Sequence, residues 1–545
     1  MSEPSDDLAR ASAWMALGTI VSRLTGFARM LLLVWAIGTS LDADLFDSAN
    51  SLPNAMYILV AGGIFNVVLV PQLVRSMRQD EDGGDAYAQR IITLGLVVLM
   101  AATVLLLIAV PALLRLVFDG LLFTDQFTDQ RESATLLMYL CLPQVFFYGA
   151  FVLVGQVLNA RRRFGPMMWA PIVNNVVAAA ALIAYVVAFG RGGSGSDGFT
   201  TREALLLGLG STAGIVVQAA VLVPYLRLAG FRYRPRFDFR GVGLGHTLRL
   251  GTWTLGFIVV NQVAFVVVNR LGTGGNLEGA ASGVQGSGSA VYSLGFLVSQ
   301  VPHGVVTVSL ATALMPTLAA LAHAGRYDGM RAEIGRTLRI ALVIIAPVAV
   351  AVACLGSEVG GAIAVGAASG DADIIGSTVA AFSLAMLAFC VHFVMLRGFY
   401  ADEDTRTPFL LQVVIASVNV VAAVVLTQAV SPARVSTALA LSYGIAYVVG
   451  TALSVTLLSR RIGRVLDAET VRFAVRLTVA CVLSAAAMLG AVALAGPLGI
   501  DGDGAGAALL VVGLGGAAGA VVYLGATRLM RVQELQYLFD TVVRR

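Results

Sequence analysis

Apolar stretches of about twenty residues recur along the whole of this 545-residue chain. Each is long enough to cross the roughly 30 Å hydrocarbon core of a bilayer as an α-helix. Charged residues make up only 12% of the chain, about half of their usual share in soluble domains. Because backbone polar groups inside a membrane must bond within the chain, we predict an all-α polytopic membrane protein. About fourteen transmembrane helices are expected, over residues 12–38, 49–74, 90–114, 134–158, 167–189, 204–226, 248–270, 290–320, 338–364, 375–399, 408–429, 435–458, 473–496 and 505–527.

Arginines alternate sharply between the loops on the two sides of the predicted membrane. Of the 36 arginines, 28 fall on the side that holds the N-terminus, six on the other side and two within the first span. Acidic residues divide almost evenly, as the positive-inside rule expects, because that rule counts Lys and Arg. Both termini are therefore predicted to be cytoplasmic. The longest outer stretch, residues 271–289, is rich in Gly and Ser and is predicted to be a flexible linker.

The second half of the chain partly echoes the first. The junction of spans four and five, residues 155–166, precedes Asn175, and the junction of spans ten and eleven, residues 398–408, precedes Asn419. Matching elements six spans apart predict two parallel six-helix lobes with a substrate site between them. The predicted division is 1–230 for spans one to six, 231–462 for spans seven to twelve, and 463–545 for two extra C-terminal helices and a short tail. Within the overlong eighth span, Pro302 and Pro316 predict a kink or an entering loop.

Two arginines, Arg23 and Arg29, interrupt the first apolar span. A guanidinium at membrane depth costs at least about 2.5–3.5 kcal/mol and cannot be neutralised by losing its proton. Arg23 lies about 18 Å into the span, near mid-depth, whereas Arg29 lies about 27 Å along and could reach the outer interface. Six residues turn a helix by about 240°, so the two do not share a stripe, although a bend at Gly26 could bring them together. We predict that they bind an anionic ligand.

Polar residues also gather where the chain enters the second span. Asp42, Asp44 and Asp47 are predicted to lie in a short outer loop, where they could pair with Arg29 or be solvated. We favour solvation for Asp42 and leave Asp44 open. Asn50 and Asn54 flank Pro53, and their role is either to cover backbone groups freed by the proline or to contact substrate.

Other reactive side chains are scattered rather than clustered. The four cysteines lie singly in apolar runs, which predicts packing rather than metal binding. His303 and His392 could couple protons, but hydrogen-bonded core histidines are the favoured interpretation. The acids at 402–404 are most simply a solvated turn. Without a nucleophile–base pair, phosphate-binding loop, metal-ligand spacing or nucleic-acid signature, we expect neither an enzyme nor a cofactor.

Several motifs together are similar to those of a known family. They are Ser22-Arg23-Leu-Thr-Gly26-Phe27-Ala28-Arg29, Leu52-Pro53-Asn54, Val70-Pro71, Leu158-Asn159 with Arg163-Phe164, and Gly398-Phe-Tyr-Ala-Asp-Glu-Asp-Thr-Arg-Thr-Pro408. The chain resembles the MurJ (MviN) family, of the superfamily that also holds multidrug extruders and O-antigen flippases, from about residue 10 to 530.

The resemblance implies movement of lipid II, the undecaprenyl-diphosphate-linked peptidoglycan precursor, from the inner to the outer leaflet of the bacterial cytoplasmic membrane. It implies that Arg23 and Arg29 line a cationic cavity and that Asp44 contributes. The implied partners are this precursor, membrane lipids and cell-wall synthesis proteins, but no nucleic acid. Transport would be driven by an ion gradient or the membrane potential, because no ATP-binding segment is present.

This chain departs from the family pattern where other members carry charge. Met30 follows the second arginine in place of an acid, Tyr57, Ile58 and Gly62 stand where charged residues are expected in span two, and Leu297 replaces an arginine. Two alternatives therefore stay open. One is an exporter of another amphiphile or polyprenyl-linked oligosaccharide, and the other is a non-transporting scaffold for envelope synthesis.

Overall fold

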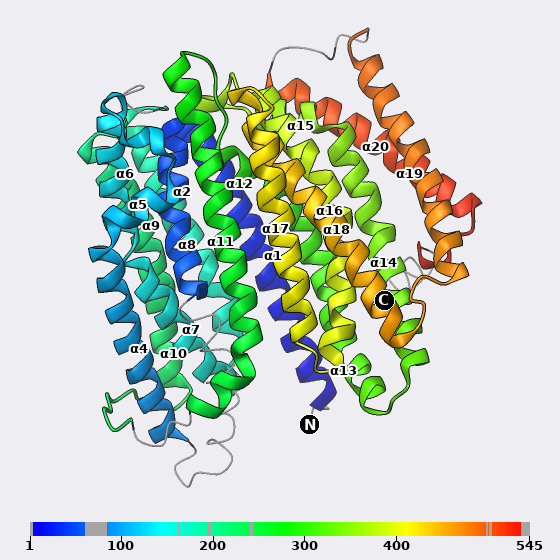
Figure 1. Ribbon diagram of the computed structural model, residues 1–545, viewed down its shortest axis with the longest axis horizontal. Coiled ribbons are helices and arrows are strands. Elements are labelled where there is room, and N and C mark those ends of the chain that lie inside the picture. Colours follow the sequence, from blue (N-terminus) through cyan, green and yellow to red (C-terminus); the bar gives the residue numbers. More distant parts are fainter. Residues whose placement is uncertain are drawn as a thin grey trace. The chain divides into compact units, whose positions relative to one another are not determined.

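The computed structural model describes residues 4–59, 84–161, 163–192, 198–239, 244–497, 500 and 504–535. These residues form helices and their connections, with no strand among them (Figure 1), which confirms the all-α prediction. Thirteen helical segments in these ranges are long and apolar enough to cross a membrane. The predicted span at 49–74 runs into residues 60–83, so Gly62 and Val70-Pro71 lie outside the described residues.

The chain divides into two compact units, Met1–Leu277 and Glu278–Arg545. The helices of unit 1 are α1 (Pro4–Ile37), α2 (Leu41–Tyr57), α4 (Asp85–Ile108), α5 (Val110–Val117), η3 (Gly120–Phe123), η4 (Asp125–Phe127), α6 (Thr128–Cys141), α7 (Gln144–Ala160), α8 (Gly165–Phe189), α9 (Thr201–Ala220), α10 (Leu222–Leu228) and most of α11 (Leu244–Ser282). The division into lobes at 230 and 462 concerns a sequence repeat and stays a prediction.

Unit 2 holds the remaining helices. They are α12 (Ser289–Pro302), η5 (His303–Thr307), α13 (Val308–His323), α14 (Tyr327–Cys354), α15 (Gly356–Ile363), η6 (Gly366–Ala368), α16 (Ala372–Ala401), α17 (Arg406–Gln428), η7 (Pro432–Arg434), α18 (Val435–Ile462), α19 (Ala468–Ala495) and α20 (Ala505–Leu529). No loop enters the overlong eighth span at Pro302 or Pro316, because the backbone stays helical from Ser289 to His323. A single π-helical turn, η5, follows Pro302 between α12 and α13.

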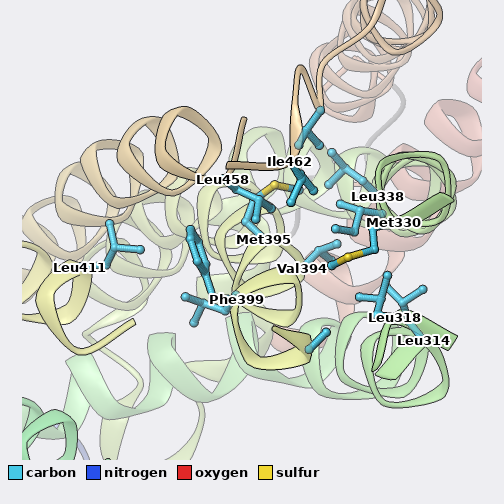
Figure 2. Close-up of a cluster of buried hydrophobic side chains, with 14 residues drawn as sticks. Leu314, Leu318, Met330, Leu338, Val394, Met395, Phe399, Leu411, Leu458 and Ile462 are labelled. Atoms are coloured by element: carbon cyan, nitrogen blue, oxygen red, sulfur yellow. The ribbon is translucent and has the colours of Figure 1, made fainter. Parts of the chain in front are cut away.

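The core of unit 2 is a cluster of aliphatic, methionine and phenylalanine side chains. Met395 and Phe399 of α16 lie among Leu411 of α17, Leu458 of α18 and Leu338 of α14 (Figure 2), and all five are nearly or fully buried. These residues come from four helices, so α16 is surrounded by its neighbours within this unit. Because lipid tails are as apolar as these side chains, the cluster stabilises the unit mainly through close van der Waals packing.

The stretch predicted to be a flexible linker is mostly helical, so that prediction is wrong. Helix α11 continues through the Gly-rich run to Ser282, and α12 begins at Ser289. The side chain of Asn269 donates to the carbonyl of Val117 at 3.2 Å, and Thr273 accepts from the backbone N–H of Asp119 at 3.4 Å. These contacts, with Thr273 fully buried, show how tertiary packing overrides the weak helix propensity of glycine.

The acidic turn at 402–404 is also not simply solvated. Arg461 of α18 pairs with the carboxylates of Asp402 and Asp404, each at 2.5 Å. Asp404 additionally accepts hydrogen bonds from the backbone N–H of Thr407 at 2.9 Å and from its hydroxyl at 2.6 Å. Only Glu403, between the two aspartates, is exposed, and its backbone is left-handed at φ 57°. These ion pairs and hydrogen bonds therefore connect the start of α17 to the end of α18.

Candidate functional site

Arg29 lines a small cavity inside unit 1. The cavity has a volume of about 50 Å³ and lies among α1, α2, α8 and α9. Its polar lining comes from Arg29, Asp47, Asn50 and Ser211, and aliphatic and aromatic side chains of the same four helices complete it. Because a water needs roughly 10–15 Å³ of such space, the cavity admits a few waters and no large ligand in this conformation.

Arg23 is placed differently from Arg29. Its side chain is exposed, whereas that of Arg29 is partly buried, and Arg23 is not among the residues that line the small cavity. Helix α1 continues through Gly26 without a break in its helical backbone. The structure thus presents one guanidinium at an exposed surface and the other beside an internal space.

Asn175 of α8 holds the segment of α1 that carries both arginines, and its role was missed from the sequence. Its side-chain amide donates to the carbonyl of Ser22 at 3.1 Å and to the hydroxyl of Thr25 at 3.0 Å. Gly26 packs beside this amide, and a Cβ there would lie 3.5 Å from its nitrogen, which is an ordinary van der Waals distance. The repeat had already singled out Asn175 together with Asn419, which accepts a hydrogen bond from Ser442 of α18 at 3.0 Å.

The aspartates at 42, 44 and 47 lie within α2 rather than in a loop, because this helix already begins at Leu41. Asp42 is buried, so the prediction that it is solvated is wrong. Asp44 is fully buried and accepts a hydrogen bond from the side chain of Asn276 at 2.9 Å. Asp42 and Asp44 occupy the first turn of the helix, where a negative charge interacts favourably with the positive end of the helix dipole.

The two asparagines around Pro53 have different surroundings. Asn50 accepts a hydrogen bond at 3.2 Å from Gln144 of α7, which also donates to Thr212 of α9 at 3.2 Å. Gln144 is 1% exposed, and a single glutamine in an apolar run gave no signal of this bridging role. Asn54 is exposed one turn further along α2. Asn50 therefore joins the polar side of the Arg29 cavity to a buried network.

Apolar and aromatic contacts occupy the positions at which the family resemblance led us to expect charge. Met30 lines the same cavity as Arg29, and the ring of Tyr57 stacks on Tyr148 with centroids 5.8 Å apart. Ile58 and Leu297 are both partly buried. Tyr57 is thus part of an aromatic pair outside the residues that line the Arg29 cavity.

The histidines and cysteines add no reactive cluster to this site. His392 is buried and hydrogen-bonds through Nδ1 to Ser454 at 3.2 Å, as expected for a core histidine. The ring of His303 is tilted against Phe389 and lies edge-on to Phe393, with centroids 4.3 and 5.0 Å apart. Three of the four cysteines are buried and none forms a disulfide. Within the described ranges, no group of three or more His, Cys, Asp or Glu side chains is arranged to hold a metal ion.

Comparisons with known proteins agree in both sequence and fold. The family model described as "Lipid II flippase MurJ" matches residues 33–499. A "Probable lipid II flippase MurJ" of Rhizobium tropici is 27% identical over 407 residues, covering 74% of this chain and 72% of that protein. One of Haemophilus influenzae is 25% identical over 411 residues, covering 72% and 75%.

Two solved structures show the same fold at low sequence identity. One is "Lipid II flippase MurJ, inward closed conformation", with a TM-score of 0.70 and 16% identity, covering 94% of this chain and 98% of that one. The other is an inward-facing multidrug resistance MATE family transporter of the MOP superfamily, with a TM-score of 0.63 and 13% identity, covering 81% and 98%.

Proposed function

This chain belongs to the MurJ family of lipid II flippases, and from that premise we propose that it moves a polyprenyl-diphosphate-linked peptidoglycan precursor across the bacterial cytoplasmic membrane. It is a multi-pass membrane protein of a transporter family rather than an enzyme. The precursor would be carried from the inner to the outer leaflet by alternating access. An ion gradient or the membrane potential would supply the energy, and both termini would be cytoplasmic.

The observation that carries this proposal is the pair of permanent charges on α1. Arg23 is exposed and Arg29 borders a polar cavity, and Asn175 fixes the segment between them. Guanidinium groups bind phosphate oxygens through paired, charge-assisted hydrogen bonds, which makes a diphosphate a suitable ligand. The high cost of an arginine at membrane depth gives a reason to expect a role for each one.

The small volume beside Arg29 supports a mechanism with more than one conformation. At about 50 Å³, this cavity cannot hold a diphosphate with its sugars, so Arg29 can engage such a ligand only after the surrounding helices separate. We propose that Arg23 makes the first contact and Arg29 the second. Asn50 would contact the ligand beside Arg29, and Asn54, exposed one turn away, would extend that contact.

Asp44 has a supporting role in this proposal. Its carboxylate is fully buried and bonded to Asn276, so it would contact substrate only in a conformation where that bond is broken. Membrane lipids and cell-wall synthesis proteins would be further partners.

The test is complementation of bacteria depleted of their own MurJ. We expect rescue by the unaltered chain and by Arg202→Ala, an exposed arginine at the start of α9, but not by Arg23→Ala or Arg29→Ala. Membrane abundance of each variant would be measured in parallel. Rescue by the two α1 variants at normal abundance would contradict the proposed role of the arginines.

A liposome assay separates transport from the alternatives. The purified chain is reconstituted with fluorescent lipid II, and translocation is followed with and without an imposed potential or ion gradient. Failure to move lipid II but movement of another polyprenyl-linked oligosaccharide would favour the exporter alternative. The Tyr57–Tyr148 stack, where charge is expected in the family, favours the scaffold alternative, which would stand if nothing moved under any gradient.

A further inference from the structure

A second cavity, unused by the proposed transport site, lies within unit 2 at the start of α19 and the end of α20. Its volume is about 250 Å³. Three arginines line it, Arg472 and Arg476 from α19 and Arg531 from the segment after α20. Phe473 and Val532, both nearly buried, supply apolar lining. Figure 1 shows these two helices in orange and red, and both pack against α14.

The positive charge of this arginine pocket is not cancelled by the acids beside it. Glu469 and Glu534 also line the cavity, but both pair with Arg339 of α14, at 3.1 and 2.6 Å. Arg476 donates to the backbone carbonyl of Arg531 at 3.4 Å, and Arg472 donates to that of Ala468 at 3.3 Å. In the part of the chain that the structure describes, no carboxylate lies within 4.0 Å of the guanidinium of any of the three lining arginines.

An exposed apolar stripe on α19 begins at the level of the arginine pocket, about 100° around the helix from Arg472 and Arg476. Val471, Val475, Val479 and Val482 are 54, 60, 45 and 61% exposed. Helix α19 is long and apolar enough to span a membrane, so these valines suit contact with lipid tails. A phosphate ion could use the arginines alone, whereas a phospholipid would use both the arginines and the stripe.

We propose that the arginine pocket binds the phosphate headgroup of an anionic phospholipid whose acyl chain lies along the valine stripe of α19. Basic pockets between transmembrane helices at the membrane surface are suited to such headgroups. The bound lipid would link the start of α19 to the end of α20. Nothing in this proposal depends on the transported substrate.

The test measures lipid binding to the purified, delipidated full-length chain in neutral detergent. The probe is phosphatidylglycerol with a fluorescent acyl chain, and phosphatidylcholine with the same label is the comparison lipid. The double variant Arg472→Gln/Arg476→Gln is compared with Arg460→Gln/Arg528→Gln, which removes the same charge from exposed positions of unit 2 outside the cavity. Each pocket arginine is expected to contribute about fivefold in affinity, so the first double variant should bind at least about tenfold more weakly.

The affinity of the control double variant for phosphatidylglycerol should fall by less than about threefold. Arg472→Lys should retain most of the binding because it keeps the charge. Equal losses in both double variants, or equal affinity for the two lipids, would overturn the proposal. Displacement of phosphatidylglycerol by millimolar inorganic phosphate would show a free-phosphate site instead. If the double variant fails to fold, the single variant Arg472→Gln replaces it, because that side chain bonds only to its own helix.

Discussion

The side-chain amide of Asn276 donates a hydrogen bond to the buried carboxylate of Asp44 at 2.9 Å and to the carbonyl of Thr39 at 3.2 Å. This contact joins the C-terminal part of α11 to the first turn of α2, more than two hundred residues away in the sequence. It holds in place the helix that carries Asn50 and one wall of the cavity beside Arg29. A glycine-rich segment is thereby a structural support of the candidate site.

Asn276→Ala should destabilise the protein by about 1–3 kcal/mol, because a fully buried carboxylate loses one of its donors. The measurement is thermal unfolding in detergent. Asn261→Ala is the matched control, since the side-chain amide of this asparagine of the same helix donates to the carbonyl of Phe257, one turn away, at 2.9 Å. A similar loss in both variants would show that the Asp44 contact contributes nothing specific.

Gln144→Leu should also destabilise the protein by about 1–3 kcal/mol. The substitution keeps the size of the side chain but removes the donor that Asn50 and Thr212 share inside unit 1. Gln89→Leu is the control, because Gln89 makes its hydrogen bond to the carbonyl of Arg232 at an exposed position. Unfolding in detergent would be compared for both, and equal stability of Gln144→Leu and the unaltered chain would contradict the bridging role.

Much of the fold could be predicted because the membrane restricts the chain to helices of a certain length. Apolar runs fix where such helices lie, and Pro302 directly precedes the π-helical turn η5. Loop composition was less informative. Gly and Ser predicted a linker at 271–289, yet most of it is helical, because whether a glycine-rich run is helical depends on partners such as Asp44 that are distant in sequence.

The candidate site could be predicted only at residues whose charge has a high free-energy cost inside an apolar span. Arg23 and Arg29 stand out because charge inside an apolar span is costly. Asn175 and Gln144 do not stand out, since a single amide in a transmembrane helix carries no sign of which backbone or side chain it meets. Solvation was predicted for Asp42, Asp402 and Asp404, and that prediction is wrong. Asp42 is buried and the other two pair with Arg461, because neighbouring helices determine their surroundings.

Because of the ion pairs of Arg461, the stability of the folded protein should depend on pH in the acid range. Burial raises the pKa of Asp404, but hydrogen bonds from Thr407 and the charge of Arg461 outweigh it and hold that pKa below the usual value near 3.8. A carboxyl whose pKa is lowered by folding stabilises the folded state above its unfolded pKa, and this contribution is lost as the pH falls through the folded pKa. Stability should therefore decline below about pH 4.

Arg461→Gln should cost about 1 kcal/mol near neutral pH, as expected for a partly exposed pair. The difference from the unaltered chain should shrink as the pH falls below about 4, because protonation removes the partner charge in both. Arg460→Gln is the control, because this neighbouring exposed arginine forms no ion pair with any residue that the structure describes. The measurement is the unfolding temperature in detergent between pH 7 and 3, and a gap that stays constant throughout would contradict the assignment.

Gly360→Ala should be strongly destabilising, because α15 and α16 meet there backbone to backbone. A Cβ at Gly360 would lie 2.1 Å from the carbonyl oxygen of Ala372 and 2.6 Å from the backbone nitrogen of Gly376. Neither atom can move as a flexible side chain does, so we expect a loss of at least about 3 kcal/mol, the upper end of the usual cost of overpacking. Gly506→Ala in α20 is the matched control, since a Cβ there would meet no heavy atom within 4 Å. That variant should be neutral or more stable by up to about 1 kcal/mol, because alanine favours the helix. Unfolding in detergent would distinguish the two, and a Gly360→Ala protein as stable as Gly506→Ala would show that the two helices can separate at this crossing without cost.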